Sequence, residues 1–317
     1  AAAFETDADN VNIVLDTTTN AITGALTFTT TAGSTSADIT LNNGATAISL
    51  ASFLAKGNLT LTSTAAIDVQ AHTVNGNLTV TSGGAITQTG ALTVSGTSSF
   101  TATGTGTNID LSTTTNAFTG AVALNTSGTG DVTIDNGIIA LNLGAVTVNG
   151  NLSVRGGLGI TDSGVINVTG TSLFNSDAAG QVITLDSINV MVGAVSITHT
   201  GAADVSIDNG TTNLILGTVG VGQNFSARSG GTITDSGVIT VAGTASFQTD
   251  VDDIDIVLDS SNAIIGAITF LTQTSGSNGA DVTLNNGTQA VILAGGTING
   301  ALSVTTGAAI SQTGALA

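Results

Sequence analysis

The 317-residue chain contains no cysteine, proline, tryptophan or tyrosine. Without cysteine, a disulfide framework, thiol catalysis and cysteine-based zinc sites are excluded. Without proline, every residue beyond the first can donate its backbone N–H, as the central strands of a sheet require. Without tryptophan and tyrosine, the chain lacks the aromatic platform on which a sugar ring usually stacks.

Charge is also scarce, because charged residues make up 8% of the chain against roughly 25% in ordinary globular proteins. The net charge is −18, and the only permanent side-chain cations are Lys56, Arg155 and Arg228. They cannot form a basic patch, so we expect neither nucleic acid nor an anionic membrane as a partner. No apolar run approaches the roughly 20 residues of a membrane span, so membrane insertion is not expected. The 41% hydrophobic residues are enough for folding.

Three landmarks recur along the sequence. ADITLNNG around Asp38 returns around Asp131, Asp204 and Asp281, and the first of these steps is the longest. A phenylalanine and an asparagine landmark recur at similar steps: Phe4, Phe100, Phe174 and Phe247, and Asn20, Asn116, Asn189 and Asn262. They predict one continuous array, 1–317, of four tandem repeats: 1–96, 97–170, 171–243 and 244–317. The first repeat contains an inserted rung, since GNLTLTSTAAIDV from Gly57 is followed by the similar GNLTVTSGGAITQ from Gly76.

Short runs of alternating apolar and polar residues, such as DVTID and NLSV, predict strands of four to six residues. Ile134 and Ile207 should point inward, and Thr133 and Ser206 outward. NG, DNG and SGG between the runs indicate tight corners that accept positive φ. The predicted fold is all-β, a parallel β-helix (β-solenoid) with rungs of about 18–24 residues. A β-sandwich array is the rival fold, but it requires domain linkers and none is visible.

Two segments carry a resemblance to a known class of proteins. GNLTVTSGGAITQTGALTVSGTSSF (76–100) and NGNLSVRGGLGITDSGVINVTGTSLF (149–174) resemble repeats of exported bacterial proteins of the filamentous haemagglutinin and autotransporter adhesin type. The resemblance implies a solenoid stalk and export to the cell surface or the extracellular space.

Catalytic groups are sparse. His72 and His199 are isolated in sequence and are expected to be solvated or corner residues. Arg155 and Arg228 occupy matching repeat positions, where the outer repeats carry Thr81 and Thr305. This spacing indicates decoration of one face, so we expect no enzyme; a polysaccharide-lyase-like β-helix is the weaker alternative.

Acidic residues gather at the start of the first and fourth repeats. Alternate carboxylates on a strand project to one side and, with corner carbonyls, could supply the oxygen ligands that calcium prefers. No cofactor is required, but calcium is a candidate ligand of Glu5, Asp7, Asp9, Asp250, Asp252, Asp253 and Asp255. The competing interpretation is a solvated acidic corner that prevents lateral aggregation.

The function that these patterns favour is a structural, extracellular rod or filament subunit. A calcium- or carbohydrate-binding adhesin module is the alternative, and ice binding through the Thr-x-Thr pairs near Thr60 and Thr79 is a weaker one. The carboxyl end, AISQTGALA, matches AITQTGALT at Ala85–Thr93 and stops before the next expected strand. The expected partners are therefore copies of the chain stacked end to end or the rest of a longer parent chain.

Overall fold

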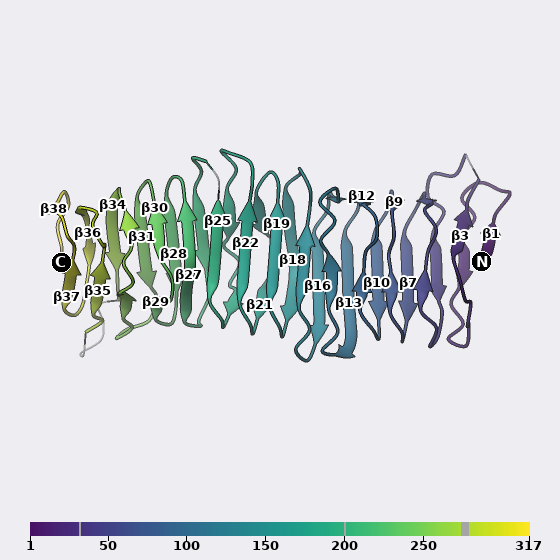
Figure 1. Cartoon of the computed structure of the whole chain (residues 1–317), viewed down its shortest axis with the longest axis horizontal. Coiled ribbons are helices and arrows are strands. Elements are labelled where there is room, and N and C mark those ends of the chain that lie inside the picture. The colour runs from purple at the N-terminus through teal and green to yellow at the C-terminus, as the bar shows by residue number, and fades with distance from the viewer. Residues whose placement is uncertain (32, 200, 274–278) are drawn as a thin grey trace. The chain divides into compact units, whose positions relative to one another are not determined.

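The chain folds as stacked parallel β-strands, with no helix among the residues that the structure describes (Figure 1). The structure is a computed structural model and describes residues 1–31, 33–199, 201–273 and 279–317. It divides into two compact units, an N-terminal unit (Ala1–Gly157) and a C-terminal unit (Leu158–Ala317). Together they contain about 15 turns of a β-solenoid, which confirms the predicted fold class.

Most turns of the N-terminal unit have one side formed by a single strand and another formed by two short strands. The single-strand side contains β4 (Ile39–Asn42), β7 (Leu59–Ser63), β10 (Leu78–Ser82), β13 (Ser98–Thr105) and β16 (Val122–Ser127). The first short strands are β8 (Ile67–Asp68), β11 (Ile86–Thr87) and β14 (Ile109–Leu111), whose sheet continues into β17 (Val132–Asp135) and β19 (Leu152–Gly156). The second short strands form what we call the third sheet: β6 (Leu54–Ala55), β9 (His72–Val74), β12 (Leu92–Val94) and β15 (Ala117–Phe118).

The C-terminal unit repeats this plan. One side contains β26 (Val205–Asp208), β28 (Phe225–Ser229), β31 (Ala245–Thr249), β34 (Ala267–Leu271) and β36 (Val291–Thr297). On the other side, the short strands β29 (Ile233–Asp235) and β30 (Ile239–Val241) both pair with the long strand β27 (Leu214–Val221). The same sheet includes β32 (Ile256–Leu258), β35 (Val282–Asn285) and β37 (Leu302–Thr305).

The strand register gives the length of each rung. Leu59 pairs with Leu78, and Ile86 pairs with Ile109; both steps fall within the predicted range. The steps from Ile13 to Ile39 and from Ile256 to Val282 are longer and exceed that range. A corner can lengthen without disturbing the ladder, because the paired strands and not the corner set the register.

Side chains alternate between the core and the surface, as period-two patterning requires. Ile134 and Ile207 are each 1% exposed, while Thr133 and Ser206 are half-buried on the outer face. The predicted facing of these strands is therefore confirmed.

Phenylalanine rings on successive turns also contact one another in the core, edge-to-face for Phe225 and Phe247 and stacked for Phe247 and Phe270. The ring centroids of Phe225 and Phe247 are 5.9 Å apart, and those of Phe247 and Phe270 are 5.8 Å apart.

The four tandem repeats of the sequence, which we call long repeats, do not contain a whole number of turns. In the C-terminal unit the Asp204 landmark forms β26, and three turns lead through β28 and β31 to β34. The next landmark copy forms β35, which lies in the opposite sheet. The long repeat that begins at Asp204 therefore spans three and a half turns, and the one that begins at Asp38 spans four and a half because of its inserted rung. In both cases the matching residues of the next repeat lie on the opposite side. The N-terminal unit behaves likewise, with β4 and β17 in different sheets.

Candidate functional site

Each copy of the ADITLNNG landmark has an asparagine just before its final glycine, and this asparagine is buried and bridges successive turns. At Asn136, Oδ1 accepts the Phe118 N–H at 2.7 Å, while Nδ2 donates to the carbonyls of Phe118 at 3.1 Å and Ala140 at 2.6 Å. At such a corner no neighbouring strand supplies hydrogen-bond partners for the backbone N–H and C=O groups, and the asparagine side chain supplies them instead. The same bonding to a residue of the preceding turn and to the corner itself recurs at Asn43, Asn209 and Asn286.

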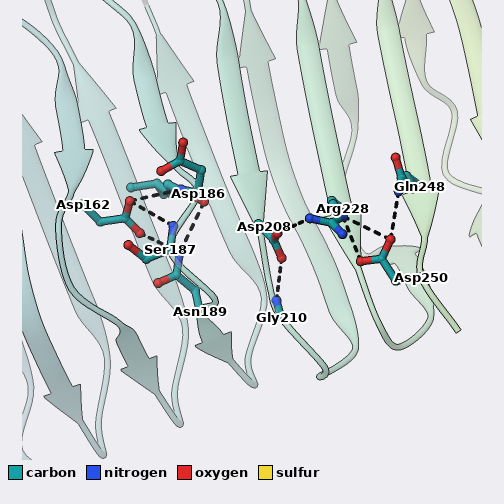
Figure 2. A network of polar contacts seen from close by, with 10 residues as sticks. Asp162, Asp186, Ser187, Asn189, Asp208, Gly210, Arg228, Gln248 and Asp250 are labelled. Atoms are coloured by element: carbon teal, nitrogen blue, oxygen red, sulfur yellow. Dashed lines mark hydrogen bonds and ion pairs between the residues drawn. The ribbon is translucent and has the colours of Figure 1, made fainter.

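A second set of buried asparagines serves the neighbouring corner. Oδ1 of Asn189 accepts the Ile166 N–H at 2.8 Å, and its Nδ2 donates to Asp162 Oδ2 at 2.8 Å. Asp162 also accepts the backbone N–H groups of Asp186 and Ser187, as Figure 2 shows. Asn262 and Asp235 repeat this arrangement. The sequence pattern indicated that these asparagines mark the repeats, but it did not indicate that they are buried. Their recurrence at one position per repeat was the only sign in the sequence of a structural role.

Glycines after the landmark asparagines confirm the predicted corner geometry. Gly137 has a φ of +59°, and a Cβ there would lie 2.8 Å from the carbonyl oxygen of Asn116. Its N–H donates to Asp135 Oδ1 at 2.7 Å. Not every NG corner is left-handed: Gly76 is outside the positive-φ set, but its Cβ position lies 2.6 Å from the Gly57 carbonyl carbon. Glycine is required there for close approach of two turns.

Arg228 forms the centre of a polar cluster on the outer face of the C-terminal unit. Its Nη1 lies 3.1 Å from Asp208 Oδ2 on the preceding strand, and its Nε lies 2.8 Å from Asp250 Oδ2 (Figure 2). Gln248 Nε2 also donates to Asp250, at 2.9 Å. The hydrogen bond to Asp250 raises the pKa of Arg228 above its usual value. An open hollow beside this cluster is lined in part by Ile188 and Val251.

Arg155 occupies the matching position in the N-terminal unit, and its Nη1 lies 2.6 Å from Asp135 Oδ2. The expectation that matching positions decorate one face is wrong within each unit. Arg155 lies on β19 and the matching Thr81 on β10, in different sheets; Arg228 and Thr305 are separated in the same way. The half-integral number of turns per long repeat causes this separation.

The predicted acidic residues use their oxygens on different partners. Asp250 is paired with Arg228, Asp253 Oδ1 accepts the Gly279 N–H at 3.1 Å, and Asp255 Oδ1 accepts the Asp281 N–H at 2.8 Å. Asp252 is half-buried beside them, and Glu5, Asp7 and Asp9 are exposed at the first acidic corner. In the part of the chain that the structure describes, no group of three or more His, Cys, Asp or Glu side chains is arranged to hold a metal ion. Calcium binding stays a prediction, which calorimetric titration tests through a saturable heat.

Both histidines are buried, so the expectation of solvated or corner residues is wrong as to solvation; each lies at one end of a strand. His72 is 3% exposed and His199 is 7% exposed. His72 begins β9, and Nε2 of His199 contacts the carbonyl oxygen of Gln181. An imidazole ring can take an inward strand position, which the isolation of these residues in sequence did not reveal.

Threonine and serine side chains, with one asparagine, form two columns on the outer face of the single-strand side of the N-terminal unit. The Thr-x-Thr pairs that begin at Thr60 and Thr79 fall on consecutive turns because they are one rung apart. Matching strands one long repeat apart lie instead on opposite sides. We call these the hydroxyl columns: Thr40, Thr60, Thr79 and Ser99, and Asn42, Thr62, Thr81 and Thr101.

Comparison with known families identifies the repeats. Four segments match a family described as repeats of unknown function (DUF5649): residues 56–125, 129–198, 202–271 and 279–317. These segments cover more than half of the chain, so the chain belongs to this family. Searches of curated proteins and of solved structures find no significant match to the chain. Across the described ranges, no helix is long and apolar enough to cross a membrane.

Proposed function

We propose that this chain is a structural, non-catalytic part of an extracellular rod or filament, such as an adhesin stalk or a surface fibre. The observation that carries the proposal is the use of polar groups between successive turns. Backbone ladders, buried asparagines and Asp–Arg pairs all connect one turn with the next. A repeat β-solenoid of this kind fits a structural role.

The mechanical argument rests on the number of contacts that must break together. Pulling two turns apart breaks the whole backbone ladder between them, for example the register pairs from Leu78–Ser98 to Ser82–Ala102. It also separates buried asparagines from partners on the preceding turn and exposes the apolar core. Since these losses coincide, a turn should resist bending and stretching until it fails cooperatively.

The partners that we propose are further turns of the same repeat, supplied by copies of the chain end to end or by a longer parent chain. A turn of a parallel solenoid offers N–H and C=O groups at the spacing that the next turn needs. The sequence resemblance supports export, and an extracellular or cell-surface location belongs to this proposal.

Electron microscopy of the purified chain with immunogold labelling of intact source cells tests the proposal. We expect elongated particles, or fibres built from them, and label outside the cell. Compact particles together with label confined to the cell interior would overturn it. Ser206→Asp on the outer face should leave the particles unchanged, whereas Ile207→Asp in the core should abolish them.

A further inference from the structure

His72 occupies a core position that carries an aliphatic residue in three other segments of similar sequence. AHTVNG around His72 corresponds to ALTVSG, VINVTG and VITVAG, which place Leu92, Ile166 and Ile239 at the same point. His72 pairs directly with Leu92 on the next turn. All three aliphatic residues are fully buried, so in these segments the position lies in the apolar core.

The surroundings of the His72 ring are aromatic and leave one nitrogen without a partner. The ring centroid lies 4.5 Å from that of Phe53, and Phe53 in turn contacts Phe28 at 5.4 Å. The backbone N–H of Phe53 donates to Nδ1 at 3.4 Å, which assigns the hydrogen of the neutral ring to Nε2. Nε2 is buried and has no hydrogen-bond partner among the described residues.

No charged group compensates a proton on this ring. The flanking strands β6 and β12 bring Leu54, Ala55 and Leu92 against β9 and carry no titratable side chain. The nearest titratable residues along the chain are Lys56, after β6, and Asp68, which is half-buried on β8 and accepts a hydrogen bond from Thr89. Neither forms an ion pair with His72 among the described residues. Burial lowers the pKa of His72 from 6.5 to about 4.

We propose that His72 makes the third sheet of the N-terminal unit an acid-sensitive segment of the fold. Protonation of the buried imidazole places an unpaired charge against Phe53 and Leu92, and the strands β6, β9 and β12 open locally to let water reach it. Opening exposes the aromatic contacts of Phe53 with Phe28. The segment is therefore closed at neutral pH and opens increasingly as the pH falls.

The direction of the pH dependence follows from proton uptake. A ring that is harder to protonate when closed than when open binds a proton on opening, so acid favours the open state. The opening constant should be flat above pH 6.5 and rise about tenfold per pH unit as the pH falls from 6.5 toward 4. Below pH 4 both states carry the proton and the rise should level off.

Hydrogen exchange of the full-length chain, corrected for intrinsic exchange rates, measures this opening. We expect the backbone amides of β6, β9 and β12 to show the tenfold-per-unit slope, and His72→Leu to abolish it. His199→Thr is the matched control, because Thr126 and Thr272 occupy the equivalent position; it should retain the slope. A pH-independent opening constant in the unmodified chain, or an unchanged slope in His72→Leu, would overturn the proposal.

A second measurement needs no variant. The chain has two histidines, so their ring resonances can be followed individually by nuclear magnetic resonance. We expect the closed-state resonance of His72 to show no titration near pH 6.5 and to lose intensity as the segment opens. A normal titration of His72 near 6.5 within an intact third sheet contradicts an acid-sensitive segment even if His72→Leu fails to fold.

Discussion

The hydroxyl columns of the N-terminal unit and the charged column of the C-terminal unit solve the same stacking problem differently. In the first, Asn42, Thr62, Thr81 and Thr101 stand in register on successive turns. In the second, Asp208, Arg228 and Gln248 stand in register, and their charges alternate before a neutral residue ends the column. Neutral side chains can repeat along a column without electrostatic cost, whereas like charges directly opposite each other on neighbouring strands repel, and an opposite charge on the next turn offsets that of Asp208.

Pairs within the chain show the same rule. Asp135 pairs with Arg155 and Asp208 with Arg228, whereas Asn285 pairs with Thr305. At each of these corners the aspartate or asparagine side chain also accepts the N–H of the following landmark glycine. The hydrogen bond to the glycine N–H therefore forms with either an aspartate or an asparagine. The charge of that residue instead correlates with its partner on the next turn, which is arginine opposite aspartate and threonine opposite asparagine.

The largest effect should come from removing the apolar support under the charged column. Ile207→Asp buries an unpaired charge beneath Ser206 and Asp208 and should lower the free energy of unfolding by about 3 kcal/mol or more. Ser206→Asp, one residue earlier on the outer face, should change it by much less. Denaturant unfolding of both variants measures this, and equal losses would show that the assigned facing is wrong.

Buried corner asparagines should come next. Asn136→Ala leaves the N–H and carbonyl of Phe118 and the carbonyl of Ala140 without their side-chain partner. We expect a loss of about 2 kcal/mol in the free energy of unfolding. Asn125→Ala, an exposed asparagine of the same unit, is the control and should be nearly neutral. Similar losses for the two variants would mean that the side-chain bridges between turns contribute little.

A smaller effect is expected in the charged column itself. Arg228→Thr leaves Asp208 and Asp250 without their cation; since the arginine side chain is 51% exposed, the loss should be about 1 kcal/mol or less. Adding Asp208→Asn recreates the Asn285–Thr305 combination and should restore part of the loss. Thermal melts at low and high salt check this, since added salt should shrink the defect of the single variant.

The smallest expected effect lies in the hydroxyl columns. Thr81→Asp places one charge between neutral Thr62 and Thr101 and should shift the free energy of unfolding by about 0.5 kcal/mol or less. Thr62→Asp combined with Thr81→Asp should cost more than the sum of the two single changes, and Thr62→Asp with Thr81→Arg less. A double-mutant cycle gives both coupling terms; zero coupling in each would remove charge compatibility as the rule for these columns.

The sequence was sufficient to predict strands, their facing and a parallel solenoid, because each depends on neighbours along the chain. Ile134 and Ile207 alternate with polar residues, and the landmark NG corners need a left-handed glycine. Predicting whether Arg155 and Thr81 lie on the same side of the solenoid would have required knowing the number of turns per long repeat. That number depends on corners whose lengths vary, as the short step from Leu59 to Leu78 and the longer step from Ile256 to Val282 show.

Partners across turns were the other limit of prediction. His72 stands at the position that Leu92 occupies on the next turn, and this correspondence indicates that it is buried. Considering His72 only as a possible catalytic residue, isolated in sequence, did not suggest that comparison. The asparagine bridges join residues on different turns, such as Asn136 and Phe118, at corners where no period-two pattern exists. Charges at the acidic corners were visible in sequence, but their individual partners, such as Gly279 for Asp253, depend on the folded corner.

The half-integral long repeat has a consequence for how a gene of this kind can grow. Duplication of a single rung, as between Gly57 and Gly76, adds one whole turn and leaves every later residue on its original side; β7 and β10 are neighbours in one sheet. Duplication of a long repeat adds three and a half turns and moves its copy to the opposite side. Slippage by one rung therefore widens an existing surface, whereas slippage by a long repeat reproduces that surface on the reverse. Two successive long duplications return it to the side on which it began.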